Sequence, residues 1–289
     1  MTEVSLWTAL ITPLKEKGGV DQETLLCLIN EQESSHNGII LMGSTGEGLL
    51  LTDQERREVL ECVTKAPSKT PIFACICGYA IEEPLKRIEE YKRYGIQGLL
   101  ILPPIYSRPG PNAQIKWFKQ LLDAAEMPCI LYNNPSRAGV SLSVDAIQAI
   151  ADHPNLFGLK EASGSVDQWR VYRRQFPSLR LYAGNDDQIW ELASEGATGL
   201  ISAMSNIWPY EMHEYVRDCL KGRQVSPVWK RNAPVFCHNN PLSIKQLMAA
   251  IGRIPCANPK APLDLLDATP VEELLKAYES MPSLGSMKC

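Results

Sequence analysis

The sequence predicts an α/β protein, a (β/α)₈ TIM barrel with a C-terminal helical extension. Short apolar segments recur about every 20 to 35 residues and alternate with amphipathic stretches, as they do in repeated βα units. The chain of 289 residues suits one such barrel, which takes about 250 residues, and leaves a remainder for further helices. Eight parallel βα units close into a barrel, so we expect one barrel rather than two average domains.

Eight apolar segments are the expected strands, because a short apolar run bounded by turn residues is typical of a buried strand. In chain order they are Leu6–Ile11, Gly38–Met42, Pro71–Ile76, Gly98–Leu102, Pro128–Tyr132, Leu156–Lys160, Leu179–Ala183 and Gly199–Ser202. The carboxyl ends of parallel barrel strands meet at one face, and barrels of this kind carry their functional residues there.

Helices are expected between these strands. One begins at Thr52, an N-cap residue with Glu55 three positions later, which is the pattern of a capping box. Another covers Ile81–Tyr94 and should end at Gly95, since glycine commonly terminates helices.

The chain beyond about Asn206 shows no further strand pattern. We expect the eighth barrel helix there, followed by helices over Pro227–His238, Ile244–Ile251 and Pro270–Ser280. The sequence therefore divides into a catalytic barrel over residues 1–224 and a helical extension over residues 225–289, in which Ser283–Cys289 should be a loose end.

Composition argues against several classes of partner and cofactor. A net charge of −4 without a basic block disfavours nucleic acid and an anionic membrane surface. No apolar run is long enough to span a bilayer, and the N-terminal residues lack the features of a signal peptide. The nine cysteines are scattered and the four histidines form no metal motif. We therefore expect a cytoplasmic protein with reduced thiols and no metal.

Lys160 is the most informative single residue. It ends the apolar segment Leu156–Lys160 and is followed by Glu161-Ala162-Ser163-Gly164, so it should lie at the carboxyl end of a strand. An amine held there with little water around it can lose its proton and attack a carbonyl carbon. A lysine taken alone is more simply interpreted as a solvated side chain, so its neighbours in the fold must decide.

Other chemically useful residues follow the neighbouring strands. They are the hydroxyl and glycine loop Gly43–Gly48, Tyr106 in the loop Pro103–Pro109, Tyr132 at the end of its strand, and Arg137 just beyond it. Each has a simpler interpretation: the loop as a tight turn, the tyrosines as packing at the barrel rim, and Arg137 as a solvated charge. Together they supply an amine, phenols for proton transfer, an anion pocket and a second carboxylate binder. That set suits formation of an imine with a 2-oxo acid and use of its enamine as a carbon nucleophile.

Four stretches of the chain resemble one known superfamily. They are Gly43-Ser44-Thr45-Gly46-Glu47, Tyr132-Asn133-Asn134-Pro135-Ser136-Arg137, Gly158-Leu159-Lys160-Glu161-Ala162-Ser163-Gly164 and Ala183-Gly184-Asn185-Asp186-Asp187. In order and spacing they are similar to the dihydrodipicolinate synthase / N-acetylneuraminate lyase superfamily. The resemblance is greatest to its branch in lysine and diaminopimelate biosynthesis, and is less distinctive beyond about Val225.

The resemblance implies a role for each candidate residue. Lys160 would form a Schiff base with pyruvate, and Ser44, Tyr132 and Tyr106 would form a hydroxyl relay for protons. Relatives often carry threonine where Ser44 stands. Ser44 and Thr45 would hold the pyruvate carboxylate, Arg137 would receive L-aspartate 4-semialdehyde, and Gly184 and Ile201 would line the pocket. The resemblance implies a lyase of the class I aldolase type without metal or organic cofactor, as a homodimer or homotetramer in which Tyr106 completes a neighbouring subunit's site.

Two alternatives stay open at this point. An N-acetylneuraminate lyase or a 2-keto-3-deoxy-sugar acid aldolase would keep the fold and the Schiff base but change the aldehyde, although Arg137 two residues after Pro135 is not expected there. A catalytically silent barrel is the other alternative, disfavoured because Lys160, Tyr132 and Tyr106 are all present. The resemblance also predicts weak or absent inhibition by lysine, since Arg56 and Ala80 stand where lysine-regulated relatives carry small polar residues, histidine, asparagine and glutamate.

Overall fold

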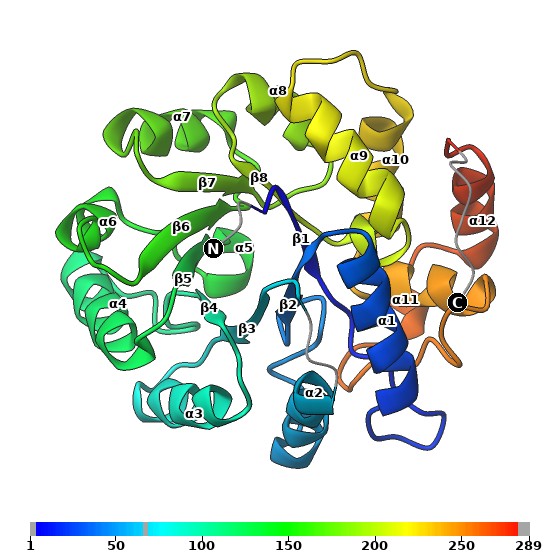
Figure 1. The fold of residues 1–289 in the computed structure, drawn as a ribbon, viewed down its shortest axis with the longest axis horizontal. Helices are drawn as coiled ribbons and strands as arrows, with labels where there is room; N and C mark the ends of the chain where they lie inside the picture. Colours follow the sequence, from blue (N-terminus) through cyan, green and yellow to red (C-terminus); the bar gives the residue numbers. More distant parts are fainter. Residues whose placement is uncertain (1–3, 66–68, 283–289) are drawn as a thin grey trace.

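The computed structural model describes residues 4–65 and 69–282, and its strands form a closed barrel in the order β1 to β8. All eight neighbouring pairs are parallel, including β1 with β8. The strands are β1 Leu6–Ala9, β2 Gly38–Leu41, β3 Ile72–Ile76, β4 Gly98–Ile101, β5 Cys129–Asn133, β6 Leu156–Glu161, β7 Arg180–Ala183 and β8 Gly199–Ser202. Figure 1 looks along the barrel and shows the helices arranged around it. The predicted (β/α)₈ fold is confirmed.

The helices follow the strands as expected for repeated βα units. They are α1 Gln22–Ser34, α2 Asp53–Lys65, α3 Glu82–Arg93, α4 Pro111–Ala125, α5 Pro135–Ala138, α6 Val144–Ile150, α7 Val166–Gln175, α8 Ile189–Ser194, α9 Pro209–Leu220, α10 Val228–Cys237, α11 Leu242–Ala250 and α12 Val271–Glu279, with short 3₁₀ helices at Met204–Asn206 and Leu265–Asp267. In the part of the chain that the structure describes, none combines the length and apolar character needed to cross a bilayer.

Two local predictions about helix ends are confirmed. The backbone N–H of Glu55 donates to Thr52 Oγ1 (3.2 Å), and the Glu55 carboxylate accepts from the Thr52 N–H (2.8 Å), which completes a capping box. Gly95 follows α3 with a φ of +76°, the left-handed conformation that glycine adopts without a steric penalty.

Strand ends differ from the prediction by a residue or two. The first predicted strand, Leu6–Ile11, is too long, because β1 ends at Ala9 and the Ile11 N–H turns to the side chain of Asn206 (2.9 Å). β5 and β6 each continue one residue further than predicted. The reason is a pairing of Asn133 with Glu161, whose side chains also form a hydrogen bond of 2.6 Å.

The interior of the barrel below its carboxyl end is filled by aromatic rings, each beside a glycine of the next strand. Trp7 pairs in register with Gly38, Phe73 with Gly98, and the ring centroids of Trp7 and Phe73 lie 4.5 Å apart. A Cβ atom at Gly98 would lie 2.3 Å from Phe73 Cζ. These glycines therefore leave the space that the rings occupy, and the barrel is a packed core rather than a pore.

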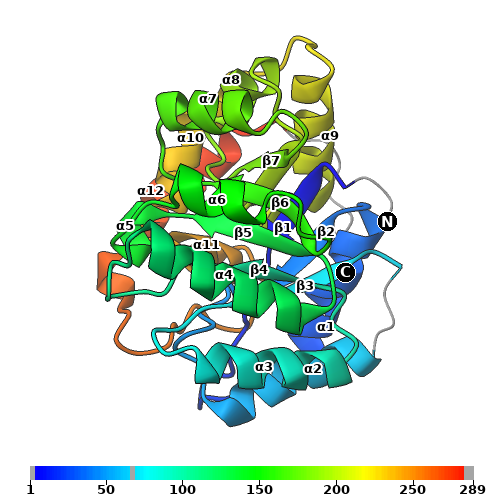
Figure 2. The same ribbon diagram turned by 90° about the vertical axis from the view of Figure 1, so that its left-hand side faces the viewer.

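The C-terminal helices pack directly on the barrel helices. Trp229 of α10 contacts Trp208, just before α9, edge to face, with ring centroids 5.6 Å apart, and Trp208 also stacks on Tyr278 of α12. Figure 2, a side view, places α5 and the helices α10 and α12 toward the same end of the barrel. The division of the chain between residues 224 and 225 stays a prediction, and the expected loose end Ser283–Cys289 lies outside the described residues.

Replacing Gly98 by alanine should destabilise the barrel. The added methyl group overlaps Phe73, which is completely buried, and overpacking of a core costs about 1–3 kcal/mol. Urea denaturation of Gly98→Ala should show that loss. The matched control is Gly110→Ala, because no atom lies within 4 Å of a Cβ built there. Equal effects of the two substitutions would contradict the role assigned to Gly98.

Candidate active site

A cavity of 440 Å³ opens at the carboxyl ends of the strands. It contains seven of the eight candidate residues, which are Ser44, Thr45, Tyr132, Arg137, Lys160, Gly184 and Ile201. They come from strands β5, β6 and β8, from helix α5 and from the loops after β2 and β7. The volume lies in the range of small-molecule sites, and the residues combine an amine, hydroxyl groups and a guanidinium.

Lys160 and Tyr132 form the centre of this cavity. The two residues are paired in register on the neighbouring strands β6 and β5, and the Lys160 Nζ atom lies 4.4 Å from the centroid of the Tyr132 ring. Both residues are buried, at 6 % and 5 % exposure. The Tyr132 hydroxyl accepts a hydrogen bond from Asn134 Nδ2 (2.9 Å). A primary amine and a phenol are thus held side by side on rigid strands, which is the arrangement that proton transfer to and from an amine adduct requires.

The loop Gly43–Gly48 forms one wall of the cavity. Thr45 is buried and Ser44 is half-buried, and both line the cavity. The loop is closed by a hydrogen bond from the Gly48 N–H to the Gly43 carbonyl (3.1 Å), and the Thr12 hydroxyl donates to the Gly46 carbonyl (2.7 Å). Two hydroxyl groups on a tight glycine loop suit an anionic oxygen group such as a carboxylate.

Arg137 lines the cavity as an exposed residue. It belongs to α5, whose N-cap residue Asn134 accepts from the Arg137 N–H (3.1 Å). Its guanidinium Nη2 donates to the main-chain carbonyl of Asn240 (3.2 Å) and forms no ion pair within the described chain. A guanidinium with free donors at a cavity mouth can take a carboxylate in a bidentate manner.

Gly184 and Ile201 complete the lining that was expected. The Gly184 N–H donates to the Glu161 carbonyl (2.7 Å), and a Cβ atom at Gly184 would lie 2.4 Å from the Cβ of Ala162. Ile201 is 1 % exposed on β8. Both residues present a close, uncharged wall to the cavity beside Lys160.

Tyr106 is the one candidate residue that the single chain does not bring to the cavity. Its side chain is 94 % exposed, and it does not belong to the lining. Its φ is +70°, in the left-handed region that a bulky residue rarely adopts. Strained backbone of this kind commonly marks a functional residue.

Sequence reasoning missed three groups that line the cavity. Asp186 is buried and accepts from the Ser202 hydroxyl and from the N–H groups of Ala203 and Met204, the latter two at 3.0 and 3.2 Å. Burial raises the pKa of the Asp186 carboxyl, and these hydrogen bonds oppose that rise. Asp186 stands in one of the quoted motifs, so its position in the sequence could have suggested it.

The other two missed groups, Cys237 and Asn240, come from the C-terminal extension. Cys237 Sγ lies 3.7 Å from Asp186 Oδ2, and burial raises the pKa of its thiol well above the ordinary value. The Asn240 Nδ2 atom donates to Thr45 Oγ1 (2.9 Å). No local pattern marks either residue, because both reach the cavity only when the extension packs on the barrel.

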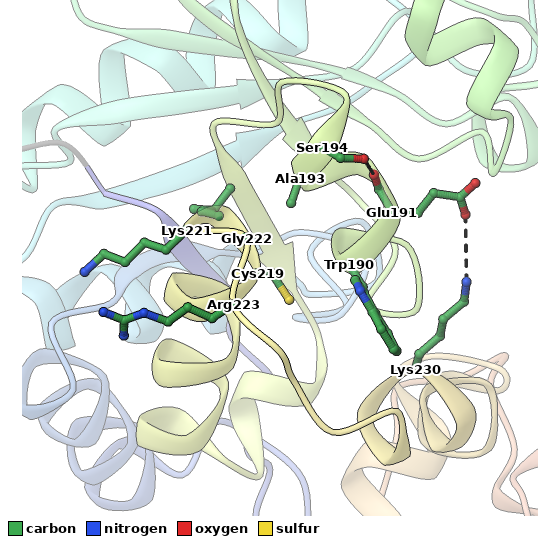
Figure 3. Close-up of a pocket in the computed structure, with 10 residues that line it drawn as sticks. Trp190, Glu191, Ala193, Ser194, Cys219, Lys221, Gly222, Arg223 and Lys230 are labelled. Carbon is green, nitrogen blue, oxygen red and sulfur yellow. Dashed lines mark hydrogen bonds and ion pairs between the residues drawn. The ribbon is translucent and has the colours of Figure 1, made fainter.

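A second, larger cavity of 760 Å³ lies beside α8, α9 and α10 (Figure 3). Figure 3 shows Glu191 beside Lys230, with 3.8 Å between their charged groups, and Lys221 and Arg223 directed away from Trp190. The basic side chains around this larger cavity lie on the surface and do not point toward a common centre. The smaller cavity is therefore the candidate site, because it contains the buried amine of Lys160, although the other cavity has the greater volume.

No group of three or more histidine, cysteine, aspartate or glutamate residues that could hold a metal ion occurs within residues 4–65 and 69–282. In the same ranges, Cys62, Cys75, Cys77, Cys129, Cys219, Cys237 and Cys256 are free thiols. Cys75 and Cys129 are buried, whereas Cys27 is only partly buried.

Arg56, which is expected to disfavour the binding of lysine, is a buried and hydrogen-bonded residue rather than a solvated surface charge. Its guanidinium donates to the Gly48 carbonyl (2.7 Å) and to Asp53 (3.1 Å). The hydrogen bond and the positive charge of Arg56 lower the pKa of the Asp53 carboxyl. The negative charge of Asp53 is therefore already paired with the positive charge of Arg56. Weak inhibition by lysine stays a prediction.

The model of the dihydrodipicolinate synthetase family matches residues 3–278. The 4-hydroxy-tetrahydrodipicolinate synthase of Wolbachia pipientis wMel is 37 % identical over 277 residues, which cover 95 % of this chain and 94 % of that protein. The chain belongs to the dihydrodipicolinate synthetase family. A relative of the same name from Chlamydia pneumoniae is 38 % identical over 278 residues, covering 96 % of this chain and 94 % of the relative.

Solved structures agree with this family over the whole fold. The chloride-inhibited dihydrodipicolinate synthase from Acinetobacter baumannii, solved in complex with pyruvate, superposes with a TM-score of 0.88 at 27 % identity, covering 97 % of this chain and all of that one. A dihydrodipicolinate synthase from Cyanidioschyzon merolae with lysine bound gives a TM-score of 0.84 at 26 % identity, covering 96 % of this chain and 99 % of that one. The family predicted from the four motifs is confirmed, and with it the barrel and a lyase of this family.

Proposed function

We propose that the chain condenses pyruvate with L-aspartate 4-semialdehyde to give 4-hydroxy-tetrahydrodipicolinate, in lysine and diaminopimelate biosynthesis. The observation that carries this proposal is the buried Lys160 amine beside the Tyr132 phenol, in a cavity that is also lined by the hydroxyl loop and by Arg137. The names of the relatives and the pyruvate complex of the Acinetobacter enzyme support the reaction and its first substrate.

The first half of the reaction uses Lys160 as the nucleophile. Its neutral amine attacks the C2 carbonyl carbon of pyruvate, and loss of water gives a protonated imine. The carboxylate of pyruvate is held by Ser44 and Thr45 on the glycine loop, which directs C2 toward the amine. Addition of the amine to C2 leaves a hydroxyl group on that carbon. Tyr132, whose hydroxyl accepts a hydrogen bond from Asn134, donates the proton with which this hydroxyl group leaves as water, and later takes a proton back.

The second half makes the new carbon–carbon bond. Tyr132, deprotonated when water leaves, takes a proton from C3 of the imine, which gives an enamine. The enamine C3 then attacks the aldehyde carbon of the second substrate, and Tyr132 gives its proton to the aldehyde oxygen, which becomes a hydroxyl group. Arg137 at the cavity mouth binds the carboxylate of the semialdehyde and so orients that carbon. The amino group of the semialdehyde portion then attacks the imine carbon, which closes the ring and releases Lys160.

The rival interpretations differ from this one at Arg137 and at Lys160. An aldolase for a sugar acid would form the same imine but would not need a guanidinium for a carboxylate at the far end of the acceptor aldehyde. A silent barrel would form no imine at all. Incubation with pyruvate and a panel of aldehydes, followed by identification of the product by mass, separates all three.

We also propose that the protein works in the cytoplasm as a homodimer or homotetramer. The free thiols in the described chain suit a reducing compartment. An exposed Tyr106 with strained backbone suits a residue that is completed by a second copy of the chain.

Lys160 should be the site of covalent modification. Borohydride with pyruvate should add a three-carbon adduct at Lys160 and abolish activity, because a reduced imine cannot be hydrolysed. Lys160→Arg retains a charge but has no primary amine to form the adduct, and it should be inactive. The control is Lys230→Met, a substitution on the surface at α10. This variant should still be labelled at Lys160. Labelling of another lysine together with an active Lys160→Ala variant would refute the assignment.

Arg137 should select the aldehyde rather than bind pyruvate. A hydrogen bond to a charged group contributes about 1.5–3 kcal/mol, so Arg137→Ala should lower kcat/KM for the semialdehyde by roughly 10- to 100-fold. The rate of pyruvate imine formation should change far less, since Ser44 and Thr45 hold that carboxylate. Equal losses for both substrates, measured by steady-state kinetics and by borohydride trapping, would count against this division of labour.

Tyr106 should act in the site of a neighbouring subunit. Mixing an inactive Tyr106→Phe variant with an inactive Lys160→Ala variant should restore part of the activity in hybrids, because one intact site can be assembled from the two chains. Subunit exchange is verified by mass spectrometry of the mixed assembly. Exchange without recovery of activity would show that Tyr106 is not shared.

A further inference from the structure

Glu47 lies in the glycine loop that carries Ser44 and Thr45, and it has an unusual conformation and environment. Its φ is +54°, in the left-handed region that non-glycine residues seldom adopt. Its side chain is completely buried and does not line the cavity. A strained residue persists only where surrounding contacts impose its conformation, so the contacts of Glu47 determine the shape of the loop.

Two groups of the C-terminal extension make those contacts. Lys245 of α11 places its Nζ atom 2.7 Å from Glu47 Oε1, and the side chains of both residues are 0 % exposed. The Lys260 N–H donates to the other carboxylate oxygen, Oε2 (2.5 Å). Lys245 also donates to the Asn258 carbonyl (2.7 Å), so the ion pair ties the loop to the chain that follows α11.

A second contact from the extension reaches the same loop. Asn240, two residues before α11, donates from Nδ2 to Thr45 Oγ1, and its main-chain carbonyl accepts from Arg137. The extension therefore contacts the loop at Thr45 and again at Glu47. From the barrel, the Thr12 hydroxyl donates to the Gly46 carbonyl and the Arg56 guanidinium donates to the Gly48 carbonyl.

A buried ion pair is weak evidence for stability, because desolvation of both charges offsets most of their attraction. An apolar pair of similar volume would fill the same space at little cost in stability. What an ion pair adds is direction, since Glu47 can satisfy its charge in only one orientation. That orientation fixes the backbone two residues from Thr45.

We propose that Lys245 is a positioning residue for pyruvate: through its ion pair with Glu47 it holds the Ser44–Thr45 loop in the conformation that binds the carboxylate of the 2-oxo acid. The inference rests on the proposed function, in which this loop receives pyruvate. Lys245 does not line the cavity, so it acts on the substrate indirectly, through its contact with Glu47.

Two variants separate positioning from stability. Lys245→Met removes the charge and keeps an unbranched side chain, but it leaves the Glu47 carboxylate buried without its partner. The double variant Glu47→Gln/Lys245→Met removes both charges. For each variant, borohydride trapping at a series of pyruvate concentrations gives the concentration at which imine formation is half-maximal, here called half-saturation. Steady-state kinetics give KM and kcat, and thermal unfolding gives Tm.

Lys245→Met should raise half-saturation for pyruvate by about 10-fold, with a lowered Tm and a kcat at saturating pyruvate changed by less than about 3-fold. The double variant should recover Tm toward the unsubstituted protein, whereas its half-saturation for pyruvate should stay raised. Recovery of both together, or an unchanged half-saturation in Lys245→Met, would show that the pair is only structural and overturn the proposal.

The controls keep the outcomes distinct. Lys230→Met breaks the exposed ion pair with Glu191 (3.8 Å), which Figure 3 draws, and should change neither half-saturation for pyruvate nor Tm. If Lys245→Met does not fold, the double variant carries the test alone: its half-saturating pyruvate concentration should be raised, and an unchanged value there would also overturn the proposal. Absence of trapping in the unsubstituted protein would refute the proposed function instead, because the pyruvate imine itself would be missing.

Discussion

The pairing of β5 with β6 is the constraint on which the rest of the site depends. Tyr132 and Lys160 are opposite each other in this parallel pair, and their side chains point into the barrel at its carboxyl end. A shift of one residue in β6 would turn Lys160 outward, toward the helices, and bring Glu161 inward. The bond between Asn133 and Glu161 at the next register position opposes such a shift, so the last pairing of the two strands also fixes Tyr132 beside Lys160.

Closure of the barrel gives this pair its environment. The aromatic rings of Trp7 and Phe73 fill the interior beneath the site, and Gly38 and Gly98 leave the space for them. A filled interior lets water approach only from the open end. The amine of Lys160 is therefore buried while the cavity above it remains accessible to small substrates.

The C-terminal extension is part of the site rather than an appendage to it. Cys237 and Asn240 line the cavity, and the buried pair of Lys245 with Glu47 joins α11 to the loop after β2. Asn240 contacts both Thr45 and Arg137, which the proposed reaction assigns to different substrates. Packing of the extension can thus affect the two substrate positions together, without any residue of α11 reaching the reacting atoms.

The sequence by itself determined the eight strands, the capped helix at Thr52, the place of Lys160 at a strand end and the family. These features depend on local apolar patterns and short motifs, which the chain displays without knowledge of its fold. Strand ends were less predictable, because they depend on long-range partners. The side chain of Asn206 takes the Ile11 N–H beyond the end of β1, and the pairing of Glu161 with Asn133 extends β6 by one residue.

Only the tertiary structure decided which polar residues share the cavity and which face away from it. Asn240 and Thr45 are 195 residues apart, and Lys245 and Glu47 are 198 apart, so no periodicity relates them. In a sequence, an isolated lysine, glutamate or asparagine is most simply interpreted as a solvated side chain. A charge is buried at little cost only when folding brings it a partner, and that partner can lie anywhere along the chain. The exposure of Tyr106 is decided in the same way, by the path of a loop after β4 rather than by the residues within it.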